Sequence, residues 1–498
     1  MRNLLLDPLC RAEDLGTPIP PTPYGISVCL PLWEDIVGYE EKDPRVIKKM
    51  HNGYPRFFIP STIERLIKVV EKKCAKANER ALIFPRRIHA ERCAEFVRPR
   101  GGSAHVTEYG KERLGVVVFA SDSYDTARLY WRFCGEIISI RQAQNALNQV
   151  DTTQDDVAPR GGSESRVIKE RLATLAGCGV EDVFLFPSGM AAAFAVHRML
   201  TTCFPSRKTV QLDFPYVDTL KIQQYFGWGV HFFPFVDDDD YERLHKIIQT
   251  ESLAGIFVEI PSNPLLTCID MCRIVEMMSI EKQKIPIVLD DTVATSVNIN
   301  AFRVADVVLT SLSKAFSGSG DVLAGSVMLN RDSEYYSAFR SFLNDHNDNE
   351  LWWGDAVVLE KNSRDFVERA RIMSKNGAAL YSFLRDHPAI QKVHYSMNDT
   401  GGAHEYFLKP RGGHSFLLSF LLKDASKTPK FYDILEFCKG PSLGTNFTLV
   451  CPYTLLAHYD ELEWAESCGI DRNLIRVSCG LEPQEAIAGR MKRALDSL

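Results

Sequence analysis

The sequence predicts an α/β protein with a mainly parallel central sheet, a smaller C-terminal α+β domain and an extended N-terminal section. From Ser165 onward, apolar runs of strand length alternate with helical patterns, as in a parallel sheet covered by helices. The chain has 498 residues, too many for one ordinary hydrophobic core. We therefore expect an N-terminal arm and α/β section at 1–150, a large domain at 151–345 and a small domain at 346–498.

The N-terminal section begins with a proline-rich segment, residues 18–23, that is typical of an extended arm. Helical periodicity follows at 63–73 and 88–97, and apolar runs at 81–84 and 115–120 are typical of strands. This pattern predicts a separate α/β unit.

Six apolar runs in the large domain predict its strands. They lie at 183–186, 209–212, 231–235, 255–260, 285–290 and 307–310. The acidic run Asp237 to Asp240 predicts a helix N-terminus, where carboxylates meet unpaired amides. Beyond it, a long helical pattern at 351–384 and strand patterns at 415–421 and 474–478 predict the smaller domain.

Composition narrows the class of partner. The net charge of -6, with 45% hydrophobic and 24% charged residues, gives no reason to expect nucleic acid or an anionic membrane. The 13 cysteines lack CxxC pairs or cysteine–histidine spacing, which argues against a metal site and a disulfide framework. We see no signal peptide or membrane anchor, and we expect a cytoplasmic protein.

The most informative stretch is 304–330, where a predicted strand ends in Thr310-Ser-Leu-Ser-Lys314 before a Gly/Ser-rich turn. A lysine at a strand end is mostly a solvated charge. One that is carried into a cleft loses hydration, so its pKa falls, as a Schiff-base nucleophile requires.

Four other strand ends carry polar residues that suit a pyridoxal phosphate cofactor. Pro187-Ser-Gly-Met190 offers helix-N-terminal amides to a phosphate, and Tyr216 offers a ring that could stack on the cofactor or simply pack in the core. Asn263 could bond a phenolate oxygen or serve the turn. Asp290 ends an apolar strand, where a protonated ring nitrogen would be a suitable partner.

The motifs FPSGMAA, YxxT, ExPSNPLL, LDDT, SLSK, SLG and IRVSCGLE occur in this order from residue 186 to 482. Together they resemble the Cys/Met-metabolism family of fold-type-I pyridoxal-phosphate enzymes, the trans-sulfuration family. SVCLPLWEDIVGYEE and GYPRFF in the N-terminal section resemble its fungal cystathionine γ-synthases in particular.

The resemblance assigns a role to each matching residue. Lys314 would be the Schiff-base lysine, Asp290 would hold the pyridine nitrogen, and Tyr216 would stack on the ring and, as a phenolate, assist deprotonation. The remaining assignments are Gly189, Met190, Ser311 and Ser313 on the phosphate, Asn263 facing the ring oxygen, and Arg476 and Ser442 in the substrate site.

Two features depart from the family pattern. Ala315 follows the lysine where many members have tyrosine, and Phe447 stands where many have a glutamate near the substrate pocket.

The family's Tyr-x-Arg pair reaches the neighbouring subunit's phosphate site. Tyr54-x-Arg56 matches it locally but lies 133 residues before Gly189, whereas Arg160 has the usual spacing without the tyrosine.

The resemblance implies γ-replacement on an O-acylhomoserine, with L-cysteine as nucleophile and L-cystathionine as product. Sulfide or a carbon nucleophile, γ-elimination, and a non-catalytic family-derived subunit are the alternatives. The acyl group and the metabolic context stay open at this point. A homodimer or homotetramer with sites completed between subunits is expected, with Tyr54 and Arg56 supplied by the partner chain.

Overall fold

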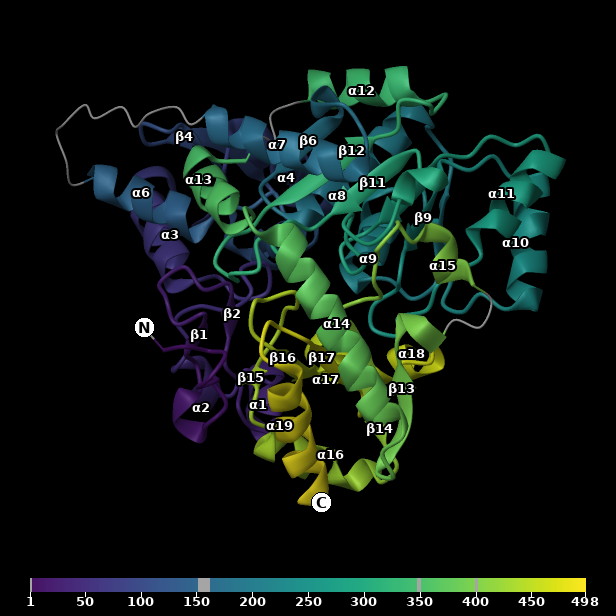
Figure 1. Ribbon diagram of the computed structural model, residues 1–498. Helices are drawn as coiled ribbons and strands as arrows, with labels where there is room; N and C mark the ends of the chain where they lie inside the picture. The colour runs from purple at the N-terminus through teal and green to yellow at the C-terminus, as the bar shows by residue number, and fades with distance from the viewer. Residues whose placement is uncertain (1, 151–161, 347–350, 399–401) are drawn as a thin grey trace.

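A seven-stranded sheet forms the centre of the molecule (Figure 1). The computed structural model describes residues 2–150, 162–346, 351–398 and 402–498. The strand order is β6-β12-β11-β10-β9-β7-β8, and β12 alone runs antiparallel to its neighbours. The predicted mainly parallel α/β sheet is therefore confirmed. Its strands are β6 (Val183–Phe186), β7 (Thr209–Leu212), β8 (Val230–Phe233), β9 (Gly255–Glu259), β10 (Ile287–Asp290), β11 (Val307–Thr310) and β12 (Gly325–Leu329).

Alternate residues of each central strand enter separate hydrophobic clusters. Val307 and Leu309 of β11 join the cluster that contains helix α8 (Gly189–Cys203), whereas Val308 joins a second cluster. This alternation follows from the twofold period of a strand, and it explains why strands buried on both faces are continuously apolar. The second cluster includes residues of α7 (Ser163–Ala176), α10 (Asp238–Thr250), α11 (Met271–Ile280) and α13 (Trp353–Asn362).

Asp237 is the N-cap of α10 and accepts a hydrogen bond from Asp240 N at 2.9 Å, so the helix start predicted from the acidic run is confirmed. The other helices of the large domain are α9 (Val217–Phe226) and α12 (Tyr336–Asp345).

The N-terminal unit contains a three-stranded antiparallel sheet of order β3-β5-β4. The predicted strands form as β3 (Glu79–Phe84) and β5 (Leu114–Ala120). The additional strand β4 (Ala104–Tyr109) was not predicted, because most of its residues are half-exposed and it lacks an apolar run. The helices of the N-terminal unit are α3 (Ser61–Cys74), α4 (Arg87–Val97), α5 (Tyr124–Cys134) and α6 (Ile140–Val150).

The small domain is built on a five-stranded sheet of order β13-β14-β17-β16-β15, in which only β15 and β16 are parallel. The helical pattern predicted at 351–384 consists of two helices, α13 and α14 (Phe366–Arg385). The strands are β13 (Ile390–His394), β14 (Leu417–Leu422), β15 (Cys438–Lys439), β16 (Leu449–Pro452) and β17 (Ile475–Ser478), and the helices include α16 (Thr428–Ile434), α17 (Tyr453–His458), α18 (Leu462–Ser467) and α19 (Gln484–Asp496).

The N-terminal segment packs on the small domain of its own chain. Lys439 N donates a hydrogen bond to Leu9 O at 3.2 Å, and Leu30 N donates one to Lys439 O at 3.0 Å. Figure 1 shows the purple N-terminal elements β1 (Pro18–Ile19), β2 (Ser27–Val28), α1 (Trp33–Glu40) and α2 (Pro44–Ile47) beside the yellow C-terminal elements. The segment predicted as an extended arm therefore lies against the small domain of its own chain.

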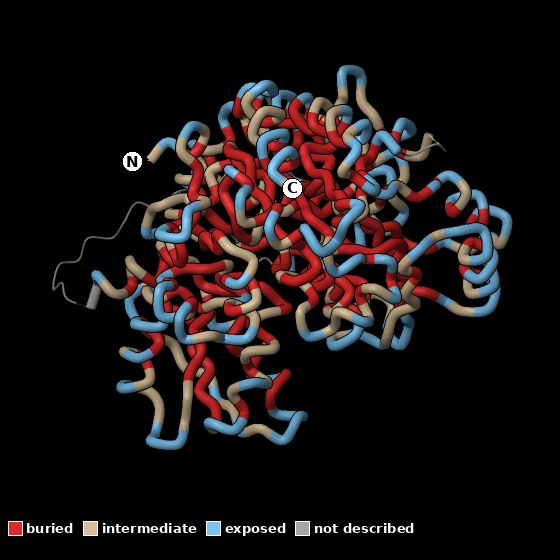
Figure 2. The backbone as a smooth tube through the Cα atoms, turned by 90° about the horizontal axis from the view of Figure 1, so that it is seen from below, coloured by how far each residue is buried: buried red, intermediate tan, exposed pale blue. Residues whose placement is uncertain are grey.

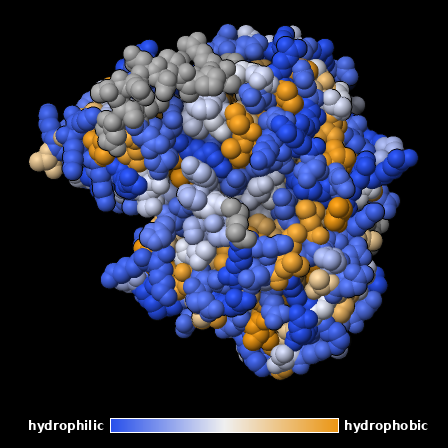
Figure 3. All heavy atoms as spheres, turned by 60° about the vertical axis from the view of Figure 1, so that its left-hand side comes forward, coloured by the Kyte–Doolittle hydropathy of each residue, from blue (hydrophilic) through white to orange (hydrophobic). Residues whose placement is uncertain are grey.

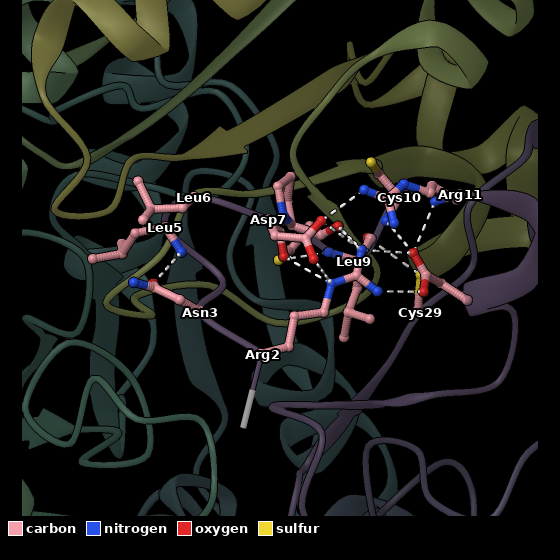
Figure 4. A network of polar contacts seen from close by, with 12 residues as sticks. Arg2, Asn3, Leu5, Leu6, Asp7, Leu9, Cys10, Arg11 and Cys29 are labelled. Atoms are coloured by element: carbon pink, nitrogen blue, oxygen red, sulfur yellow. Dashed lines mark hydrogen bonds and ion pairs between the residues drawn. The ribbon is translucent and has the colours of Figure 1, made fainter.

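Charged groups fix the first residues of the segment (Figure 4). Arg2 forms ion pairs with Asp7 at 3.0 Å and with Asp14 at 2.6 Å, and Asp14 also accepts hydrogen bonds from the Cys10 and Arg11 amides, each at 3.0 Å. Asp14 is buried, so its pairing compensates for lost hydration.

Buried residues run through the interior of the molecule, and exposed residues lie mostly at its periphery (Figure 2). On the face shown in Figure 3, hydrophobic side chains gather in small separate groups among hydrophilic ones. Within the described ranges, no helix is long and apolar enough to span a bilayer.

Candidate functional site

A cavity lies where the carboxyl ends of the central strands face the small domain. The edge is the expected ligand-binding side of such a sheet, because the loops after parallel strands converge there. All but one of the described residues predicted for the site line this cavity: Tyr54, Arg56, Gly189, Met190, Tyr216, Asn263, Asp290, Ser311, Lys314, Ser442 and Arg476.

Ser313 is the exception among the predicted residues. Its side chain is buried, donates to Ala324 O at 3.2 Å and accepts from Ala324 N at 2.9 Å. The hydroxyl thus fixes the turn after β11 to the start of β12. Ser313 is not among the residues that line the cavity. The phosphate contact predicted for Ser313 stays a prediction.

The turn between β6 and α8 presents a helix N-terminus to the cavity. Ser188 is the N-cap and accepts a hydrogen bond from Ala191 N at 3.0 Å. A Cβ on Gly189 would lie 2.7 Å from Ser311 Oγ, so only glycine permits this close approach. First-turn amides without intrahelical acceptors, together with Ser311, form a suitable anion site.

Lys314 projects from the turn after β11 between the large and small domains. Its Nζ donates to Ser442 Oγ at 2.9 Å and to Tyr54 Oη at 3.4 Å. Burial lowers the pKa of Lys314, and the nearby Tyr54 opposes this shift. The desolvated lysine expected from the sequence is therefore present, and its neutral amine is more accessible than that of a surface lysine.

Tyr54 and Arg56 reach the cavity of their own chain. Arg56 is only 1% exposed; it donates hydrogen bonds to Asp218 and to the Tyr216 hydroxyl, and its guanidinium lies 5.6 Å from the Tyr216 ring centroid. The prediction that a partner chain supplies this pair is therefore corrected: the 132 residues between Arg56 and Gly189 contain the folded N-terminal unit, and the pair lines the cavity of its own chain. Arg160, the other arginine considered, lies outside the described residues.

The two tyrosines differ in acidity. Burial acts to raise the pKa of Tyr54, but the Lys314 and Arg56 cations outweigh it and lower the net pKa. Burial raises the pKa of Tyr216 well above its ordinary value, although Arg56 opposes the shift. Tyr54 is therefore the phenol that more readily becomes a phenolate, whereas the sequence suggested Tyr216.

Asp290 and Glu259 are neighbours in the sheet, because they form a register pair between the parallel strands β10 and β9. Burial raises the pKa of Asp290 to about 6, and Thr292 opposes the shift through hydrogen bonds. Burial, followed by the Asp290 charge, raises the pKa of Glu259 well above its ordinary value. Both effects favour the protonated form of Glu259, which accepts a hydrogen bond from Tyr216 N at 2.8 Å.

Arg476 reaches the cavity from β17 of the small domain. Its guanidinium donates to Asn263 Oδ1 at 3.0 Å and to Ser442 O at 2.9 Å, and lies 4.8 Å from the Tyr453 ring centroid. The side chain is 7% exposed. These contacts hold the fork of donors in one orientation, as recognition of a carboxylate requires.

Three residues near the site were not predicted: Glu259, Asp218 and Tyr453. Glu259 lies in the motif ExPSNPLL and Asp218 in the motif YxxT. A carboxylate within a cofactor-site motif was the sequence feature that could have identified them. Phe447, expected near the substrate pocket, instead packs in an apolar cluster with Leu9 and Cys438. Its side chain is therefore directed away from the cavity.

The site residues fit the pyridoxal phosphate that the resemblance implies. Among the described residues, no cation pairs with the Asp290 carboxyl, so a protonated ring nitrogen would complete it. Asn263 Oδ1 accepts from Arg476, which leaves its amide as a donor toward a ring oxygen. The α8 N-terminus suits a phosphate, and Lys314 is the buried amine that an aldehyde requires.

Comparison with known proteins places the chain in a family. Residues 144–496 match the model of the Cys/Met metabolism PLP-dependent enzymes, and residues 62–139 match that of the fungal trans-sulfuration enzyme N-terminal domain. Cystathionine gamma-synthase of Neurospora crassa is 32% identical over 97% of this chain and 98% of its own length. A cystathionine gamma-synthase-like enzyme of Amanita muscaria, iboG1, is 31% identical over 97% of both chains.

Among solved structures, cystathionine gamma-lyase from Lactobacillus plantarum, complexed with L-serine, superposes with a TM-score of 0.58 at 22% identity. The superposition covers 70% of this chain and 91% of the other, and it confirms the fold. The chain is thus a fold-type-I, pyridoxal-phosphate-dependent member of the Cys/Met-metabolism family with the N-terminal domain of the fungal trans-sulfuration enzymes.

Proposed function

We propose that the protein catalyses γ-replacement on an O-acylhomoserine, with L-cysteine as nucleophile and L-cystathionine as product. The observation that carries the proposal is the convergence of Lys314, Asp290 and Arg476 on one cavity. A buried amine, a carboxylate for the cofactor ring and a fork for a substrate carboxylate are the groups that such chemistry needs. Their joint presence also argues against a non-catalytic subunit.

Pyridoxal phosphate, when bound, supplies the electron sink for negative charge that develops on the amino-acid substrate. Asp290 would keep the ring nitrogen protonated, and the α8 N-terminus with Gly189, Met190 and Ser311 would hold the phosphate. Tyr216 would offer its ring to the cofactor ring. Arg476 and Ser442 fix the substrate carboxylate, which orients the Cα–H bond toward Lys314.

Lys314 moves protons at the substrate Cα and Cβ, and its lowered pKa makes the neutral amine more available than that of a surface lysine. Tyr54 lies 3.4 Å from Nζ and takes the proton that the amine must lose. We assign this role to Tyr54 rather than to Tyr216, whose hydroxyl pairs with Arg56 and whose pKa is raised. The Cγ–O bond then breaks, the carboxylate leaves with the bonding electrons, and the thiolate sulfur of cysteine forms the new bond at Cγ.

The assay incubates the holoenzyme with O-acetyl-, O-succinyl- or O-phosphohomoserine and with L-cysteine, sulfide or no nucleophile. Mass spectrometry identifies the products. The proposal predicts cystathionine, with acyl release that depends on cysteine. Equal release without a nucleophile would indicate γ-elimination, and preferred formation of homocysteine would indicate sulfide as the substrate; either result contradicts the proposal.

We further propose a homo-oligomer, dimer or tetramer, in the cytoplasm, since the cysteine pattern suits a reducing compartment. Sedimentation of the holoenzyme tests the oligomer.

A further inference from the structure

Tyr453 carries a buried polar group without a partner. The residue begins α17, directly after β16, and is 3% exposed. Within the described part of the chain, its Oη has no hydrogen-bond partner. Buried hydroxyls are normally paired, and leaving one unpaired destabilises the fold, so the exception needs an explanation.

The position of Tyr453 suggests one. It lines the same cavity as Arg476 and Lys314. The Arg476 guanidinium carbon lies 4.8 Å from the Tyr453 ring centroid, so the ring supports the guanidinium. Arg476 is held from its other sides by Asn263 Oδ1 and Ser442 O.

The phenol is suited to donate rather than to accept a proton. Burial raises the pKa of Tyr453, and the Arg476 cation opposes this shift without reversing it. At neutral pH the group is therefore an uncharged hydroxyl with one hydrogen to give. Beside the Arg476 fork this hydroxyl adds a further donor at the cavity, which suits an anion with two acceptor oxygens.

We propose that the Tyr453 hydroxyl donates a hydrogen bond to the α-carboxylate of the amino acid that Arg476 binds. Tyr453 is thus a specificity residue for substrates with a free carboxylate. The inference rests on the proposed function only for the class of substrate, an α-amino acid. It does not depend on the leaving group or on the nucleophile.

The test compares wild-type holoenzyme with Tyr453→Phe. Tyr335→Phe is the matched control, because Tyr335 Oη is also buried without a partner in the described chain and Tyr335 does not line the cavity. L-alanine and L-alaninamide are titrated separately and binding is followed by the cofactor absorbance. L-alaninamide lacks the carboxylate charge. Its affinity for each variant is therefore the reference for the affinity of L-alanine for the same variant.

Tyr453→Phe is expected to weaken L-alanine binding about tenfold, the usual effect of losing one hydrogen bond to a charged group, and L-alaninamide binding less than threefold. Tyr335→Phe should leave both unchanged. Because the variant removes an unpaired hydroxyl, its melting temperature should equal or exceed that of wild type. An unimpaired melting temperature together with weaker L-alanine binding is a result that a merely structural role of Tyr453 would not give.

An equal loss for both ligands, or no loss for either, would overturn the inference. A lower melting temperature with unchanged binding would do the same, since it would assign Tyr453 to packing. If the γ-replacement assay fails while the carboxylate-dependent difference persists, the proposed reaction is wrong and the carboxylate assignment stands.

Discussion

Lys314 Nζ donates a hydrogen bond to Ser442 Oγ at 2.9 Å, across 128 residues of sequence. The contact joins the turn after β11 to the loop between β15 and β16, and so links the two domains at the cavity. Ser442 adopts a φ of 91°, in the region that favours glycine. A strained residue that aims a hydroxyl at a buried amine is typical of a functional site.

Two substitutions of Ser442 distinguish the effect of its hydroxyl from the effect of its strained backbone. Ser442→Ala and Ser442→Gly both lose the contact with Lys314, so each should lower kcat/KM about tenfold. Glycine accommodates the positive φ, so the Gly variant should be more stable than the Ala variant by up to about 1 kcal/mol. Thermal melts and steady-state kinetics measure both effects, and equal stability of the two variants would remove the argument from strain.

Subunit mixing tests whether each site lies within one chain. Inactive Lys314→Ala and Arg56→Ala proteins are exchanged, with exchange demonstrated by differently tagged chains. Because Arg56 contacts Tyr216 and Asp218 of its own chain, every mixed oligomer still lacks an intact site. No activity should return. Partial recovery would mean that the pair crosses to a partner chain.

Asp290 makes cofactor binding depend on pH. Its pKa is raised to about 6 in the folded protein, above 3.8, so ionising it as the pH rises through 6 reduces the stability of the cofactor-free protein. Below pH 6 the carboxyl is protonated and offers no charge to a protonated ring nitrogen. Cofactor affinity should therefore fall as the pH decreases below 6.

Asp290→Asn is the control for this pH dependence. The amide should bind the cofactor more weakly at pH 8 and should show a flatter profile between pH 5 and 8, with kcat reduced more than KM changes. An unaltered profile in equilibrium cofactor titrations would show that another group titrates.

Glu259 is expected to act as a neutral acid. Its folded-state pKa lies well above 4.5, so its contribution to stability is full at pH below 4.5 and is lost as the pH rises through the folded pKa. Glu259→Gln keeps an acceptor for Tyr216 N and should match or exceed wild-type stability at pH 8. Glu259→Ala loses the acceptor and should be less stable by about 1–3 kcal/mol. If the Gln variant were the less stable in urea unfolding, the carboxylate itself would be required.

The strand-end residues were predictable because parallel strands all deliver their carboxyl ends to one edge of the sheet. Gly189, Tyr216, Asn263, Asp290 and Lys314 follow strands whose apolar runs were plain in the sequence, and all line one cavity. The sheet order and the pairing of Glu259 with Asp290 depend on long-range register, which local pattern does not encode.

The route of the N-terminal segment was not predictable for a similar reason. The sequence spacing between Arg56 and Gly189 gives the length of the chain between them but not its path. The folded unit between them allows Arg56 to lie at the cavity of its own chain. Phe447 and Ser313 show a related difficulty: a motif places a residue near a site, whereas packing decides which way its side chain points.

Mapping the lysine that carries the cofactor tests the central claim most directly. Borohydride reduction of the holoenzyme makes the bond between cofactor and lysine permanent, and peptide mass spectrometry locates the pyridoxyl group. Lys439 is an internal competitor, since it is also buried and burial lowers its pKa to about 8. The structure predicts one pyridoxyl group per chain, on Lys314. A label on Lys439 or any other lysine, or no label on a cofactor-loaded protein, would contradict the account.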